Sequence, residues 1–141
     1  MKTVTFFGHK DTPQETEPTL RATLLDLIIN KNATVFFVGN NGYFDAMVRN
    51  QLKELSVIYP IRYSVVLAYL PDERNTDDMS DTIYPEGLEK VPKRFAISWR
   101  NKWMLKQSDI VVTYVKHSFG GAAQFKELAQ KQGKTVIELS E

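Results

Sequence analysis

The sequence predicts an α/β protein built around a mainly parallel sheet. Five short runs rich in β-branched and aromatic residues indicate strands, at residues 4–7, 34–38, 61–70, 110–115 and 135–139. Segments of helical character separate them, and this alternation is typical of a parallel sheet with right-handed crossovers. Polar loops containing glycine or asparagine follow the strands, where such sheets bind ligands. The length of 141 residues predicts a single domain over residues 1–141.

Four helices are expected between these strands, at about residues 20–28, 44–55, 95–107 and 122–132. The first shows the pattern clearly, because Leu20, Leu24 and Leu27 recur at helical spacing and form one apolar stripe. Residues 72–93 are rich in Asp, Pro and Asn and predict a long irregular loop. A loop of that length inside a compact domain usually serves a function.

Composition limits the classes of function. The formal net charge is +1 and there is no long basic block, which argues against nucleic acid as a partner. The chain has no cysteine and only two histidines, so we expect no disulfide, metal site or cofactor. No apolar run approaches the length of a membrane span, and we expect a cytoplasmic protein without a membrane partner.

The strand at 110–115 leads into the most informative loop. Gly120 and Gly121 follow it and precede a helix, where free N–H groups and the helix dipole favour an anion. The backbone of Ala122 and the hydroxyl of Ser118 could add contacts to a bound phosphate. A plain turn between strand and helix is the alternative.

Two other loops are predicted to reach the same edge of the sheet. Gly8 and His9 follow the first strand, and Gly39, Asn40 and Asn41 follow the second. His9 could exchange protons near neutral pH or simply serve as a hydrogen-bonding loop residue. The asparagines could contact a ribose or base, or could stabilise a left-handed turn.

Several short motifs in a fixed order give the chain a resemblance to a known family. It resembles small bacterial and phage members of the SLOG superfamily, which includes the DNA-processing protein DprA and the LOG enzymes. The motifs are FGHK at 7–10, VGNNGYFD at 38–45, YPEGLE at 84–89, PKRFAI at 92–97, RNKWM at 100–104, SD at 108–109 and GGA at 120–122. The resemblance implies a Rossmann-like three-layer sandwich, a five-stranded sheet in the order 3-2-1-4-5, and a nucleotide-derived ligand.

The resemblance also implies a candidate catalytic residue. LOG enzymes hydrolyse an N-glycosidic bond with an arginine and a glutamate that follows the glycine turn. Arg100 matches that arginine, and Arg94 is a second candidate for ligand contact, but Gln124 or Phe125 stands where the glutamate belongs. Because glutamine cannot exchange a proton, the loss favours binding over catalysis. Three carboxylates could substitute for the glutamate: Asp45, Glu86 and Glu127.

The favoured hypothesis is therefore a sensor, carrier or sequestering protein that binds a nucleotide or nucleotide-derived ligand. The alternative is a LOG-like hydrolase acting on nucleoside monophosphates or other N-ribosyl compounds, with Arg100 as its candidate catalytic residue. The sequence does not decide whether the protein is an enzyme. We also expect a homo-oligomer, because Trp99, Trp103 and Met104 could form an exposed apolar face.

Overall fold

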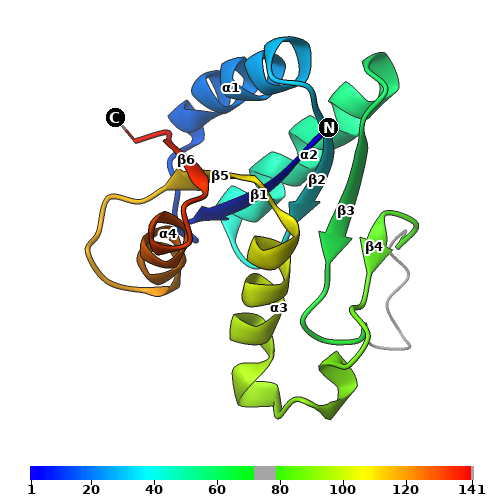
Figure 1. Ribbon diagram of the computed structural model, residues 1–141, viewed down its shortest axis with the longest axis vertical. Helices are drawn as coiled ribbons and strands as arrows, with labels where there is room; N and C mark the ends of the chain where they lie inside the picture. The colour runs from blue at the N-terminus through cyan, green and yellow to red at the C-terminus, as the bar shows by residue number, and fades with distance from the viewer. Residues whose placement is uncertain (72–78, 141) are drawn as a thin grey trace.

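The computed structural model describes residues 1–71 and 79–140 and contains one six-stranded parallel sheet (Figure 1). The strand order is β4-β3-β2-β1-β5-β6, and every neighbouring pair is parallel. The strands are β1 (Lys2–Gly8), β2 (Ala33–Val38), β3 (Arg62–Val66), β4 (Thr82–Ile83), β5 (Ile110–Tyr114) and β6 (Thr135–Glu138). The predicted α/β class, the Rossmann-like arrangement and the order of the five expected strands are confirmed.

Four α-helices connect the strands and cover both faces of the sheet (Figure 1). They are α1 (Glu17–Asn30), α2 (Tyr43–Ile58), α3 (Lys93–Gln107) and α4 (Gly121–Lys131), and two short 3-10 helices are η1 (Gln14–Thr16) and η2 (Leu88–Lys90). Among the described residues, no helix is both long enough and apolar enough to cross a bilayer.

The two faces of the sheet bury separate apolar cores. Helices α1 and α2 cover one face with side chains such as Leu24, Phe44 and Leu52, all fully buried. Helices α3 and α4 cover the other, where Met104 and Phe125 pack against the sheet. This three-layer packing explains why β5 is buried along its whole length.

The predicted five-stranded sheet lacked one edge strand. The third strand was expected at 61–70, but β3 is shorter, and β4 pairs with it through the registers Val65–Thr82 and Val66–Ile83. Both β4 and η2 lie within the segment expected to be an irregular loop, of which residues 72–78 lie outside the described part. A two-residue strand carries too little pattern to be identified from sequence alone.

The expectation that Trp99, Trp103 and Met104 form an exposed apolar face is wrong for Met104, while both tryptophans are half-buried. Met104 is buried, and the half-buried Trp103 ring meets the Phe37 ring edge-on with centroids 5.2 Å apart. Trp99 packs against a small cluster formed by Ala68, Leu88 and Ala96. These three side chains therefore contribute mainly to the packing of the monomer, and the homo-oligomer stays a prediction.

Candidate functional site

A cavity of about 250 Å³ opens at the carboxyl edge of the sheet, between the end of β1 and the first residues of α4. Strand β1 lies between β2 and β5, where the chain order of the sheet reverses. Parallel sheets bind ligands at such a reversal because the loops on its two sides diverge. The wall is made by Phe6, Phe7, Gly8, His9, Lys10, Asn41, Asp45, Ile97, Arg100, Asn101, Met104, Gly121 and Ala122.

Arg100 is the largest charged side chain in this wall and is only 2% exposed. Its Nε donates to Asn101 Oδ1 over 2.9 Å, and its Nη1 donates to the Val66 carbonyl over 2.8 Å and to Asn40 Oδ1 over 3.2 Å. Within the described residues, Nη2 has no hydrogen-bond partner. Burial lowers the pKa of Arg100 and the charge of Asp45 opposes this, yet an arginine stays protonated.

Asp45 is the acidic member of the wall and lies in the first turn of α2. Its Oδ2 accepts the N–H of Asn41 over 2.9 Å, so the side chain holds the loop residue that precedes the start of its own helix. Burial raises the pKa of Asp45 to about 6, although the Asn41 N–H and the charge of Arg100 both oppose the rise. A carboxyl group with this pKa exchanges protons near neutral pH.

Two glycines leave space for side chains that pack closely against the ends of β1 and β2. A Cβ at Gly39 would stand 2.8 Å from Asp45 Oδ2 and 2.9 Å from Arg100 Cζ. A Cβ at Gly8 would stand 2.3 Å from the ring of Phe44, which is fully buried under the rim. Both glycines are therefore required by close packing, and neither needs to touch a ligand to explain its presence.

The N-terminus of α4 forms the opposite wall. Gly120 precedes the helix with φ of 94°, which glycine adopts without strain, and no atom lies within 4 Å of a Cβ built at Gly120 or Gly121. The first hydrogen bond across this turn runs from the Gln124 N–H to the Gly120 carbonyl, over 3.1 Å. The N–H groups of the preceding residues therefore remain available at the positive end of the helix dipole.

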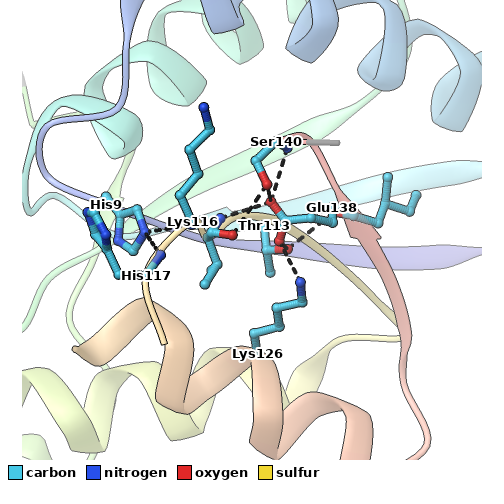
Figure 2. Close-up of polar contacts among 9 residues, drawn as sticks. His9, Thr113, Lys116, His117, Lys126, Glu138 and Ser140 are labelled. Carbon is cyan, nitrogen blue, oxygen red and sulfur yellow. Dashed lines mark hydrogen bonds and ion pairs between the residues drawn. The ribbon is translucent and has the colours of Figure 1, made fainter. Parts of the chain in front are cut away.

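His9 links the end of β1 to the loop after β5. Its Nε2 accepts the N–H groups of Lys116 and His117 over 2.9 and 3.3 Å (Figure 2). The rings of His9 and His117 lie 4.5 Å apart, and the ring of Phe119 stacks on His117 at 5.2 Å. Phe119 is 72% exposed, so this ring stack (His9, His117 and Phe119) ends at the surface.

A carboxylate network beside this loop was not predicted from sequence. Glu138 at the end of β6 accepts hydrogen bonds from Thr113, Lys126, the Val115 N–H and both the N–H and hydroxyl of Ser140 (Figure 2). Burial alone would raise the pKa of Glu138, but these donors lower it to about 2. The network anchors the start of the loop, and no short motif marks it because its members come from three elements.

The structure brings together only some of the predicted site residues. Gly8, His9, Asn41, Arg100, Gly121 and Ala122 line the cavity. Gly39 and Asn40 lie behind Arg100, and Gly120 caps α4 without lining the cavity. Ser118 is exposed in the loop outside the wall, and Arg94 is exposed with its guanidinium 4.8 Å from the ring centre of Phe95.

Some wall residues were not predicted, although the sequence held a signal for them. Ile97, Asn101 and Met104 follow one another on α3 at spacings of four and three residues, and with the predicted Arg100 they share one face of that helix. Of the three proposed substitute carboxylates, Asp45 alone belongs to the wall; Glu86 is exposed and Glu127 pairs with Lys131 on the surface of α4. Within the described residues, no group of three His, Asp or Glu side chains is placed to hold a metal ion.

Comparison with solved structures places the chain in the SLOG-type fold. DNA processing protein A (DprA) of Streptococcus pneumoniae superposes with a TM-score of 0.69 and 13% identity, over 98% of this chain and 50% of that one. DprA of Helicobacter pylori, described for its single-stranded DNA binding mode, superposes with a TM-score of 0.61 and 18% identity, over 97% and 64%. No protein-family model and no curated protein sequence matches the chain.

These similarities confirm the resemblance to the SLOG fold and correct one expectation. Nucleic acid was expected to be an unlikely partner on the basis of net charge, but a protein of the same fold binds single-stranded DNA. Net charge averages over the whole surface, whereas a nucleic acid responds to local charge and stacking surfaces. Here Lys10, Lys116 and the N-terminus of α4 lie close to the exposed ring stack despite a net charge of +1.

Proposed function

We propose that this protein, which shares a SLOG-type fold with DprA, binds a nucleotide or nucleotide-derived ligand. The binding site is the cavity at the carboxyl edge of the sheet. The observation that carries the proposal is Arg100, which is 2% exposed, lines the cavity and keeps Nη2 free of protein partners among the described residues. A buried guanidinium with free donors favours an anion that accepts two hydrogen bonds, as phosphate does.

The opposite wall supplies a second group suited to phosphate. The cavity reaches Gly121 and Ala122, whose N–H groups lie in the first turn of α4. The open space around Gly121 lets a phosphate approach the backbone, and the helix dipole favours its charge. Phosphate between Arg100 and α4 would therefore meet positive groups on both sides.

The size of the cavity limits the ligand. Its volume of about 250 Å³ lies just below the usual range of ligand sites, roughly 300–1,000 Å³. One nucleotide unit is the largest ligand that it can largely enclose. Longer ligands such as ADP-ribose would extend towards the exposed ring stack beside α4.

A calorimetric titration tests the proposal with AMP, GMP, cyclic AMP, ADP-ribose and inorganic phosphate as probes. Saturable binding of at least one nucleotide, weakened by Arg100→Lys and unchanged by Arg94→Lys, supports it. Arg94 is a matched control because it lies on the same helix but is exposed and outside the wall. Absence of binding by every probe at millimolar concentration would contradict it.

A second function, hydrolysis of an N-glycosidic bond, is favoured by Asp45. In that reaction water adds to C1′ of the ribose, the bond to the base breaks, and the base leaves with a proton. Asp45 lines the cavity with a pKa near 6 and could activate the water, while Arg100 holds the phosphate. Chromatography of AMP or GMP incubated with the protein would show free base, and Asp45→Asn would abolish its release.

A third possibility is that the bound nucleotide belongs to single-stranded nucleic acid. It is favoured by the exposed ring of Phe119, stacked on His117 beside Lys116, since aromatic surfaces next to basic groups bind unpaired bases. Fluorescence anisotropy with labelled DNA and RNA oligonucleotides tests it. Binding that weakens with salt and with Phe119→Ala supports an oligonucleotide partner, whereas binding of mononucleotides alone contradicts it.

A further inference from the structure

The loop between β5 and α4 is held by two sets of hydrogen bonds with different chemistry. At its start, Val115 donates its N–H to Glu138 and accepts a hydrogen bond from the Ser140 hydroxyl. In its middle, the N–H groups of Lys116 and His117 both point at Nε2 of His9 (Figure 2). In the described part of the chain, the loop then runs to Gly120 with no further hydrogen bond to another segment.

The two bonds to His9 require one protonation state. Nε2 can accept a hydrogen bond only when it carries no proton, so the neutral ring carries its proton on Nδ1. Protonation of Nε2 would direct an N–H at the two N–H groups of Lys116 and His117. Both hydrogen bonds would then be lost together, and like partial charges would face each other.

The groups around His9 on every side oppose or favour that protonation. Burial and the neighbouring His117 lower the pKa of His9, while Asp11 and Glu138 act in the opposite direction. The Tyr114 ring meets His9 edge-on at 6.2 Å, and the Lys116 ammonium lies over Tyr114. The pKa of His9 therefore lies below that of an ordinary histidine. The ring is neutral at pH 7 and gains its charge at a lower pH than an ordinary histidine does.

We propose that His9 is a positioning residue: its neutral imidazole holds the Lys116–His117 backbone, and through it the Gly120–Gly121 start of α4, and its protonation releases this loop. The effect on ligand binding rests on the proposed function, because it assumes that the N-terminus of α4 contacts the phosphate. The effect on the loop stands without that assumption.

Nuclear magnetic resonance on the full chain tests the loop directly. The His9 ring is titrated from pH 8 to pH 4.5 while exchange of the Lys116 and His117 amides is measured and corrected for the intrinsic pH dependence of exchange. Protection of both amides should fall at least about fivefold as His9 becomes charged, the expected effect of losing one net hydrogen bond. Protection that stays constant through the His9 titration would overturn the proposal.

Three variants separate this role from simple packing. His9→Gln keeps an acceptor that does not titrate, so protection should become independent of pH; His9→Ala should lose protection at every pH. His117→Gln leaves His9 in place and should preserve the pH response. A His9→Gln variant that still responds to pH as the wild type does would overturn the assignment to His9.

The effect on ligand binding is measured with ADP-ribose, whose diphosphate does not titrate in this range. Asp45 also titrates here, so the ratio of the dissociation constants of wild type and His9→Gln is followed, because Asp45 contributes equally to both. The ratio should rise as His9 becomes charged, and a constant ratio would overturn the link to binding. Absence of ADP-ribose binding at every pH would count against the proposed function, while amide exchange would still decide the effect of His9 on the loop.

Discussion

Nη1 of Arg100 donates a hydrogen bond of 2.8 Å to the carbonyl oxygen of Val66, the last residue of β3. This bond ties the centre of α3 to the carboxyl edge of the sheet and sets the direction of the guanidinium. Because Nε and Nη1 are engaged by protein groups, the rotation of the head group is fixed and Nη2 remains for a ligand. A donor held in this way binds an anion without a further loss of side-chain entropy.

Arg100→Lys should weaken nucleotide binding by about tenfold to a hundredfold, because lysine keeps the charge but loses the planar pair of donors. It should also lower the free energy of unfolding by about 1–3 kcal/mol, since the acceptors behind it lose partners. Calorimetry and urea denaturation measure the two effects. Equal affinity in the wild type and a folded Arg100→Lys variant would remove Arg100 from the site.

Gly121→Asp should separate stability from binding. The position is open and its backbone does not require glycine, so the new carboxylate should complement the dipole of α4 and stabilise the fold by about 0.5 kcal/mol. The same negative charge should repel a phosphate and weaken nucleotide binding at least about tenfold. Thermal unfolding and calorimetry test both directions, and a variant that binds as well as wild type would contradict the role of α4.

Gly8→Ala should destabilise the protein by about 1–3 kcal/mol, because the added methyl group meets the buried ring of Phe44. Gly121→Ala is the matched control, since the same change there meets no atom within 4 Å. Urea denaturation measures both. The second change Phe44→Leu should recover part of the loss in Gly8→Ala, and a Gly8→Ala variant as stable as the control would contradict the packing.

Glu138 should stabilise the fold in a way that depends on pH. Its pKa falls from 4.5 to about 2 on folding, so its contribution is full above pH 4.5 and is lost as the pH falls towards 2. Glu138→Gln should lower the free energy of unfolding at pH 7 by about 2–4 kcal/mol and flatten its dependence below pH 4.5. Glu127→Gln on the exposed side of α4 should change neither.

The contribution of Asp45 to the stability of the fold should depend on pH in the opposite direction. Its pKa rises from 3.8 to about 6 on folding, so its contribution is greatest below pH 3.8 and is lost as the pH rises through about 6. Asp45→Asn should therefore gain stability relative to wild type between pH 4 and pH 7, by up to about 3 kcal/mol. Denaturation across this range measures the gain, and the exposed Asp26→Asn is expected to show none.

The sequence was sufficient for the features that depend on local pattern. Strand runs such as residues 110–115 predicted the parallel sheet, and the glycines that follow them predicted the edge where the cavity opens. The three layers and the strand order were implied by the resemblance to the SLOG superfamily. Gly120 shows the limit of such patterns: it caps α4 as expected, yet the cavity wall begins only at Gly121.

The features that were missed depend on contacts between distant elements. The short β4 is defined by pairing with β3, and the Glu138 network joins β5, α4 and the end of the chain. The burial of Arg100 depends on contacts with distant residues such as Val66, which lies 34 residues earlier. The residues next to Arg100 in the sequence therefore do not predict that its side chain is buried. Net charge was a poor guide to nucleic-acid binding because it does not show where on the surface the charged side chains lie.

The most direct test of the central claim is a calorimetric titration of AMP and ADP-ribose against wild type, Arg100→Lys and Gly121→Asp, with Arg94→Lys as control. The account predicts saturable binding of at least one ligand to wild type and Arg94→Lys, with affinity reduced at least about tenfold in the other two. Binding that is absent from the wild type, or that is unchanged in both Arg100→Lys and Gly121→Asp, would contradict it.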